Sequence, residues 1–238
     1  MSEFAIEAQD LSKTFRGGVT AVKDLNLKIN RGTVYGLIGR NGAGKTTLLR
    51  LLMGLLRPTT GVAKILGAEL MTAPHTIRAD VAYVSQVQRL DSWMTLRELC
   101  RYVGSLYPTW DQLYAERLAE RFELPWDREI RILSGGEQRK ASILLAFAAR
   151  PSVLILDEPA GGLDPVARRQ LVDEIVDLVS NDDEHTILFS THIISDIERI
   201  AEYVGIMDRG QIVMSTPLED LQKKTRGVQV VFDGDGRF

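Results

Sequence analysis

The sequence contains little cysteine and no long apolar run. Cys100 is its single cysteine, so no disulfide can form within the chain. The longest uninterrupted apolar stretch, residues 143–149, is much shorter than the about 20 residues that a membrane-spanning helix needs. The N-terminus also lacks the basic and then apolar plan of a secretory signal. We therefore expect a chain of the reducing cytoplasm that does not itself span a membrane.

Positive charge is not in excess either. Lysine and arginine number 29 against 32 aspartates and glutamates, which gives a net charge of −3. This balance provides no overall positive field to hold nucleic acid or an anionic membrane surface, and we expect no nucleic-acid partner. With 45% hydrophobic and 26% charged residues, the composition excludes the disordered and fibrous classes. At about 150 residues per domain, the 238 residues predict one large domain or a core with an inserted subdomain.

Hydrophobic periodicity divides the chain into strand-rich and helix-rich parts. Apolar and polar residues alternate over residues 25–30, and a glycine turn precedes them, which predicts paired antiparallel strands in the first thirty residues. A short apolar strand over residues 34–38 and a glycine-rich turn lead into leucines at helical spacing, residues 48–56. Residues 88–149 then read as helices that two prolines interrupt.

Strands and helices alternate again in the last third of the chain. The predicted elements are a strand at 153–156, a helix at 166–179, a strand at 186–190, a helix at 195–201 and a strand at 203–207. Such alternation implies a parallel sheet covered on both faces. We therefore predict an α/β fold with an N-terminal antiparallel β portion, a parallel-sheet core and an inserted α-helical subdomain.

The predicted domain boundaries follow from these parts. Residues 1–217 form one domain, in which 1–87 and 150–217 make the core and about 88–149 make the helical subdomain. Residues 218–238 remain as a C-terminal tail, in which Val228, Val230 and Phe232 alternate as in a strand. We expect this tail to be the start of a truncated extension, although a swapped or frayed end explains it equally well.

A complete phosphate-binding motif follows the strand predicted at 34–38. It consists of Gly39, Arg40, Asn41, Gly42, Ala43, Gly44, Lys45 and Thr46. Glycines let backbone N–H groups turn around phosphate oxygens, and the following helix presents the positive end of its dipole to them. Lys45 is expected to reach the β- and γ-phosphates and Thr46 to ligate Mg²⁺. We predict an ATP site that includes the next residue, Thr47; the alternative is a helix-capping turn without a ligand.

Two acids end the apolar strand predicted at 153–156. In a parallel sheet, the C-terminal edge of the strands is where ligands bind, so Asp157 is expected in the Mg²⁺ shell. Because side chains alternate along a strand, we expect Glu158 to point away from Asp157 and to act as general base on the attacking water. The alternative places both acids in the first turn of a helix, which Pro159 and the following glycines disfavour.

A second helix start carries the sequence Leu-Ser-Gly-Gly-Glu-Gln. Ser134 and Glu137 have the spacing of a capping box, and Gly135 and Gly136 leave backbone N–H groups accessible at the helix start. Two phosphate-binding helix starts in one chain indicate either one site with two walls or a dimer in which each chain supplies the opposite wall. A capped helix with no further role is the alternative.

These motifs, in this order, resemble the nucleotide-binding subunit of an ATP-binding cassette (ABC) transporter. The resemblance covers the chain from Phe4 to about Pro217. Residues 133–138 are similar to the family's signature segment, and residues 39–46 and 153–158 resemble its two Walker motifs. The segment at 106–110 resembles exporter-type cassettes. The resemblance thus implies an ATPase of the P-loop type that uses ATP and Mg²⁺.

The resemblance also implies roles for further residues. Gln86 resembles the glutamine that reaches Mg²⁺ and water, and Phe15 stands where the family places an aromatic ring against adenine. Asp164 belongs to a loop that crosses the dimer interface, so it joins Ser134 and the two signature glycines as part of the site in trans. His192 resembles the histidine that contacts the γ-phosphate, and it completes a catalytic set with Lys45 and Glu158.

Several of these residues have structural alternatives. Phe15 could be a core aromatic, Gln86 a surface residue at a strand end, and His192 a helix cap. We expect His75 and His185 to be loop or surface residues. Three tryptophans are predicted to lie in the core of the helical subdomain, with Trp93 also a candidate partner contact: Trp93, Trp110 and Trp126.

The sequence departs from the family pattern at two places. Arg40 replaces the proline or serine common there, which changes the outer wall of the phosphate cradle but leaves its amides. Gly161 and Gly162 replace the usual start of the Asp164 loop, so communication between subunits is less certain there.

The function that the resemblance implies is transport coupling. Two copies of the chain, or one copy and a homologous cassette, are expected to bind two MgATP head to tail and to drive a separate transmembrane permease. The chain is then attached peripherally to the inner face of the cell membrane. A soluble ABC ATPase of a cofactor-assembly complex and a non-hydrolysing regulatory module are the alternatives. The permease, not this chain, selects the cargo.

Overall fold

The N-terminal strands form an antiparallel sheet of their own. The structure, a computed structural model, describes residues 3–87, 89–180 and 185–224. In it β1 (Phe4–Thr14) pairs antiparallel with β2 (Thr20–Asn30) on one side and with β4 (Thr60–Ile65) on the other. The predicted pairing within the first thirty residues is confirmed. The pairing of β4 with β1 was not predicted.

A second, larger sheet carries the rest of the fold. Its strand order is β5-β6-β7-β3-β8-β9. The strands are β5 (Val81–Val84), β6 (Val153–Asp157), β7 (Thr186–Thr191), β3 (Val34–Gly39), β8 (Tyr203–Asp208) and β9 (Gln211–Pro217). The first five are parallel, and β9 runs antiparallel to β8. The predicted α/β class and the parallel core are confirmed.

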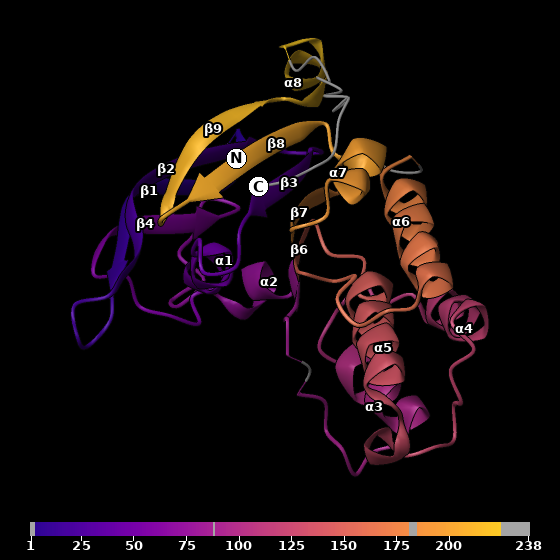
Figure 1. Cartoon of the computed structure of the whole chain (residues 1–238). Coiled ribbons are helices and arrows are strands. Elements are labelled where there is room, and N and C mark those ends of the chain that lie inside the picture. Colours follow the sequence, from indigo (N-terminus) through magenta and orange to yellow (C-terminus); the bar gives the residue numbers. More distant parts are fainter. Residues whose placement is uncertain (1–2, 88, 181–184, 225–238) are drawn as a thin grey trace, which may run out of the picture.

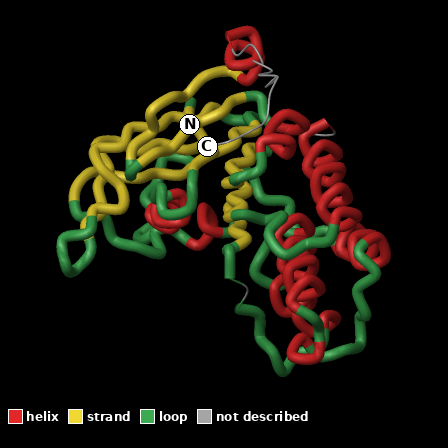
Figure 2. The backbone as a smooth tube through the Cα atoms, viewed as in Figure 1, coloured by secondary structure: helices red, strands yellow, loops and turns green. Residues whose placement is uncertain are grey.

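Helices cover both faces of the parallel sheet (Figures 1 and 2). On one side α1 (Lys45–Leu52) and α2 (His75–Arg78) lie between the two sheets. The other side holds α3 (Leu96–Gly104), α4 (Gln112–Arg121), a 3₁₀ turn (Ile130–Ile132), α5 (Gly135–Ala148), α6 (Pro165–Ser180) and α7 (Ile194–Ile200). The short helix α8 (Leu218–Lys224) follows β9.

The alternation of side chains along the buried strands divides the core into two clusters. Leu154 and Leu156 of β6 belong to the cluster under α3–α7, whereas Val153 and Ile155 belong to the cluster around α1. Successive side chains of a strand point to opposite faces, and every residue of β6 is buried. A strand covered on both faces is therefore apolar throughout, which is why β6 could be predicted as a parallel-sheet strand.

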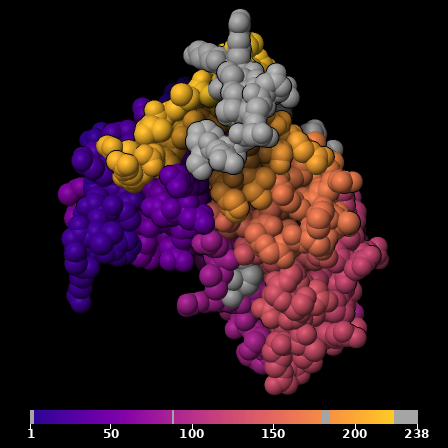
Figure 3. Space-filling view, viewed as in Figure 1, coloured from indigo at the N-terminus to yellow at the C-terminus, as the bar shows by residue number. Residues whose placement is uncertain are grey.

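The helical segment shares a core with the sheet that it covers. Side chains of α3, α4 and α5 pack in the same cluster as the inner face of β6 and β7. The surface nevertheless shows these helices as a lobe that projects away from the N-terminal strands, with a hollow between the two (Figure 3). The boundaries at 88 and 149 stay a prediction. The alternation at 228–232 lies outside the described residues.

The prediction that Trp93 lies in the core is wrong. Trp93 is 67% exposed and is not part of the core, although Trp110 and Trp126 pack against it. His185 lies in the loop just before β7, as predicted, but it is buried, with its Nδ1 2.7 Å from the carbonyl oxygen of Pro151. A core role for Phe15 is also excluded, since that side chain is 40% exposed.

A buried carboxylate joins α4 to α6. Glu174 of α6 is 2% exposed and forms an ion pair with Arg121 of α4. The Tyr114 hydroxyl donates a 2.7 Å hydrogen bond to the same carboxylate. Burial and the neighbouring charge raise the pKa of Tyr114, so the hydroxyl stays a donor at neutral pH. These contacts hold the helical segment to the helix that follows β6.

Replacing the Tyr114 hydroxyl tests this contact. We expect Tyr114→Phe to lower the free energy of unfolding by about 2 kcal/mol, because a buried carboxylate loses a hydrogen-bond donor. Tyr107→Phe is the control, since the Tyr107 hydroxyl makes a longer bond, 3.4 Å, to the carbonyl of Val81. Urea unfolding at pH 7 measures both variants, and equal losses would contradict a specific role for the Glu174 contact.

Candidate functional site

The loop between β3 and α1 forms a cradle of backbone N–H groups. Gly44 precedes α1 with φ 107°, and a Cβ at this position would lie 2.2 Å from the carbonyl oxygen of Ala21. Gly42 also has a positive φ of 81°. Both conformations favour glycine, and the helix after the loop directs its positive end at the pocket. The geometry suits an anion such as a phosphate group.

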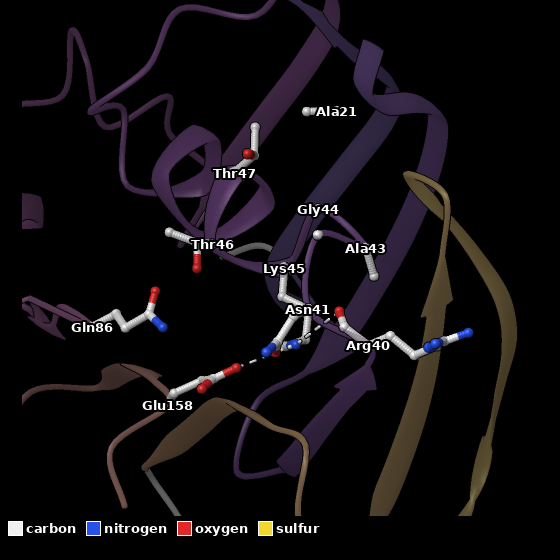
Figure 4. A pocket seen from close by; sticks show the side chains of 11 residues that line it. Ala21, Arg40, Asn41, Ala43, Gly44, Lys45, Thr46, Thr47, Gln86 and Glu158 are labelled. Carbon is white, nitrogen blue, oxygen red and sulfur yellow. Dashed lines mark hydrogen bonds and ion pairs between the residues drawn. The ribbon is translucent and has the colours of Figure 1, made fainter. Parts of the chain in front are cut away.

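Lys45 lies beneath this cradle. Its side chain is 5% exposed, and its Nζ donates to the Gly39 carbonyl at 2.7 Å. The same Nζ lies 3.3 Å from Oε1 of Glu158, which is a close ion pair across the pocket (Figure 4). A buried ammonium is stable only with such partners. Lys45 therefore places a positive charge between the phosphate cradle and Glu158.

The buried end of β6 is held by hydroxyl groups. Asp157 is fully buried, and its Oδ1 accepts from Thr46 Oγ1 at 3.1 Å and from Ser190 Oγ at 2.8 Å. Its Oδ2 accepts a weaker bond from the Tyr83 hydroxyl at 3.4 Å. Burial, reinforced by the charge of Asp157, raises the pKa of Tyr83 to about 12, which keeps this hydroxyl protonated.

These oxygen atoms fit a magnesium ion. Thr46 supplies a hydroxyl oxygen, Asp157 a carboxylate and Gln86 an amide oxygen, which are hard ligands of the kind that Mg²⁺ prefers together with substrate phosphates. Thr46 and Asp157 are in direct contact, and Gln86 lines the same pocket as Thr46. The assignment of these three residues to Mg²⁺ stays a prediction.

Glu158 does not follow the strand alternation on which its prediction depended. β6 ends at Asp157, and Glu158 has φ 46°, in the left-handed region that a residue with a side chain rarely adopts. Such a conformation costs on the order of 1 kcal/mol or more. The turn brings the Glu158 carboxylate to Lys45, and its Oε2 lies 3.3 Å from Nδ1 of His192. This turn, and not the predicted alternation, sets the direction of the Glu158 side chain.

The pocket joins most of the predicted residues (Figure 4). Its lining consists of Ala21, Arg40, Asn41, Gly42, Ala43, Gly44, Lys45, Thr46, Thr47, Gln86 and Glu158. Phe15 is not among them, because it begins the turn between β1 and β2, where the Lys13 ammonium lies 5.5 Å from the centre of its ring. The same hairpin nevertheless brings Ala21 into the pocket.

The signature segment and Asp164 lie outside this pocket. Ser134 caps α5 in the predicted capping box, with its Oγ 2.7 Å from Oε2 of Glu137. Asp164 accepts from the backbone N–H groups of Val166 and Ala167 at 2.9 Å, bonds that lower the pKa of its carboxyl group. A Cβ on Gly136 would lie 3.7 Å from the Gly162 carbonyl, so the two segments are neighbours. Within this chain they form a separate surface.

Sequence reasoning missed residues that hold the site together. Arg139, one turn into α5, donates to the carbonyl of Ser85 at 3.2 Å and also to that of Gln86. Desolvation lowers the pKa of this half-buried guanidinium. Ser190 was also missed, and its position opposite Asp157 becomes visible only from the pairing of β6 with β7. The available sequence signal for Ser190 was its position two residues before the candidate site residue His192.

Comparisons with known proteins agree on one family. A protein-family model described as ABC transporter matches residues 22–161. The chain is 34% identical to the ABC transporter ATP-binding protein YtrB of Bacillus subtilis, over 97% of this chain and 78% of that protein. It is 30% identical to the bacitracin transport ATP-binding protein BcrA of Enterococcus faecalis, over 99% of this chain and 77% of that protein.

Solved structures show the same fold. The structure of an ATP-binding subunit of an ABC transporter superposes with a TM-score of 0.82 at 30% identity, covering 92% of each chain. The ATP-binding cassette MJ0796, solved as a dimer with ADP and phosphate, has a TM-score of 0.79 at 23% identity, over 90% of this chain and 98% of that one. At that identity, the second likeness concerns the fold alone.

Proposed function

The chain belongs to the ABC transporter family, and from that premise we propose that it binds and hydrolyses MgATP as one of two nucleotide-binding subunits that drive a transmembrane permease. The observation that carries the proposal is the meeting of a phosphate cradle, Lys45, Thr46 and Glu158 around one pocket, with Asp157 hydrogen-bonded to Thr46. A cradle alone would support binding. The carboxylate of Glu158 beside it supports hydrolysis.

The proposed reaction is displacement at the γ-phosphate. The cradle N–H groups and Lys45 hold the phosphate oxygens and stabilise the charge that develops on them. Thr46, Asp157 and Gln86 would hold the Mg²⁺ ion, which supplies further charge neutralisation when bound. A water oxygen bonds to the γ-phosphorus, the bond to the β–γ bridging oxygen breaks, and ADP leaves with phosphate. Glu158 accepts the proton from the water, and His192 contacts the γ-phosphate.

Phosphate binding would also change the partners of Lys45. Lys45 Nζ lies 3.3 Å from Glu158 Oε1 and also bonds the Gly39 carbonyl. A phosphate in the cradle competes for the same ammonium, because it carries more negative charge than a single carboxylate. Glu158 is then released from Lys45 and can accept a proton from water. ATP binding and activation of the base are thereby coupled in one pocket.

A second copy of the chain, or a homologous cassette, is proposed to supply the opposite wall. Ser134, Gly135 and Asp164 do not line the described pocket and are exposed on the surface, where the start of α5 offers backbone N–H groups. Head-to-tail pairing of two chains brings Ser134, Gly135 and Gly136 of one to the cradle of the other. Phe15 is proposed to contact the adenine.

The work of the ATPase is proposed to be done on a membrane protein. Across the part of the chain that the structure describes, none of the helices combines the length and the apolar character that crossing a membrane requires. YtrB and BcrA are, by their names, ATP-binding proteins of transporters. We propose peripheral attachment at the inner face of the cell membrane through a separate permease that selects the cargo.

Substitution of the proposed base tests the hydrolysis step. We expect Glu158→Gln to lower the rate of phosphate release by about 100-fold or more, because the general base is lost, while ATP still binds. Glu98→Gln makes the same change in the capping box of α3, away from the pocket, and is expected to keep full turnover. Phosphate release and nucleotide affinity are measured in both variants; near-normal turnover in Glu158→Gln would refute the assignment.

Isolation of the chain with its native partners tests the transport role. We expect a tagged chain, extracted from its own cells in mild detergent, to retain a polytopic membrane protein in stoichiometric amount. Mass spectrometry of the retained subunits identifies that partner. Retention of a defined soluble complex without a membrane protein would instead support an assembly ATPase.

A further inference from the structure

One buried hydroxyl connects the two carboxylate residues at the end of β6. Ser190 of β7 is fully buried and stands directly opposite Asp157 in the parallel register. Its Oγ donates to Asp157 Oδ1 at 2.8 Å and accepts from the backbone N–H of Glu158 at 2.9 Å. A hydroxyl has one hydrogen to donate and lone pairs to accept. The Ser190 hydroxyl therefore donates its hydrogen to the Asp157 carboxylate and uses a lone pair to accept from the backbone N–H of Glu158.

The second of these bonds supports an unfavourable backbone conformation. Glu158 has φ 46°, and its N–H is held by the Ser190 hydroxyl at 2.9 Å and by the Ser190 carbonyl at 3.2 Å. A residue that carries a side chain adopts this conformation only when surrounding contacts impose it. Ser190 supplies two such contacts from the neighbouring strand.

The direction of the Glu158 carboxylate depends on this conformation. With the left-handed turn, Oε1 lies 3.3 Å from Lys45 Nζ and Oε2 lies 3.3 Å from His192 Nδ1. An extended Glu158 would continue the alternation of β6, in which successive side chains point to opposite faces of the sheet. Its carboxylate would then leave the pocket that Lys45 lines.

Other buried hydroxyls of β7 have different roles. Thr186, at the opposite end of the strand, accepts from the backbone N–H of Gly32 at 3.0 Å. Thr191 accepts from the N–H of Ile193 at 3.0 Å, in the turn before α7. Neither bond involves a carboxylate. Ser190 therefore does more than satisfy a polar group inside the sheet.

We propose that Ser190 is a positioning residue for ATP hydrolysis, which acts by fixing the backbone of Glu158 so that the carboxylate faces the water and the γ-phosphate. The proposal rests on the proposed function, because it assigns Ser190 a role only through Glu158. Ser190 does not line the cradle, and its loss leaves the phosphate-binding N–H groups in place. Ser190 thus affects the chemical step and not the affinity for ATP.

Removal of the hydroxyl is the direct experiment. With the full chain at saturating Mg²⁺, we expect Ser190→Ala to lower kcat by about 10- to 100-fold, the range for a small displacement of a reacting group, with KM for ATP unchanged. Ser190→Cys keeps the shape but offers a weak donor and a weak acceptor, and it should lose turnover similarly. Thr186→Val removes a buried hydroxyl from the other end of β7 and should retain kcat.

Combining Ser190→Ala with Glu158→Gln distinguishes a positioning role of Ser190 from a purely structural one. If Ser190 acts through Glu158, Ser190→Ala leaves the residual single-turnover rate of Glu158→Gln unchanged. The same fold-loss in both backgrounds would overturn the proposal. Full kcat in either Ser190 variant, or loss of ATP binding in both, would overturn it as well.

Failure of the proposed function gives a different result. In that case the unsubstituted chain does not hydrolyse ATP, or Glu158→Gln keeps its turnover. If Ser190→Ala acted on the metal site through Asp157 instead, the half-saturating Mg²⁺ concentration would shift while kcat at saturation recovered. That outcome would also contradict positioning of Glu158.

Discussion

Two carboxylates at the end of one buried strand must each have their own donors, and the arrangement of the pocket depends on this requirement. Asp157 is fully buried and receives hydroxyl donors from α1 and β7. Glu158 receives the ammonium of Lys45 and faces His192. Because adjacent acids repel one another and lose solvation on burial, each carboxylate needs hydrogen-bond donors or a positive charge beside it. The left-handed turn at Glu158 separates them.

The parallel sheet makes this separation possible. β6 lies between β5 and β7, and its C-terminal edge is next to the loops that carry Gln86 and His192. The phosphate cradle follows β3, which is bonded to β7. Loops that are far apart in the sequence therefore converge at one edge of the sheet, as parallel strands place their carboxyl ends together. Apolar side chains are buried on both faces of β6 up to this edge.

The sequence alone was enough to predict the motifs and the sheet class, because glycine spacing, a wholly apolar strand and terminal acids are local signals. Ser190 and Arg139 could not be predicted, since their roles depend on strand register and on the packing of α5 beside the Gln86 loop. The φ of Glu158 also has no local signal. The burial of His185 has no local signal, because this loop residue is covered through its contact with the Pro151 carbonyl. Trp93 was misplaced because it lies in the turn before α3, where no periodicity shows whether a side chain is covered.

Ser134, Gly135 and Gly136 do not line the pocket of their own chain, so we propose that a complete site requires two chains. Light scattering of Glu158→Gln protein with and without MgATP measures this requirement directly. We expect the mass to double on addition of MgATP, and Ser134→Ala in that background to weaken the doubling. Thr95→Ala, which removes the corresponding cap from the capping box of α3, should leave it intact. A mass that stays at one chain at saturating MgATP would contradict the two-chain site.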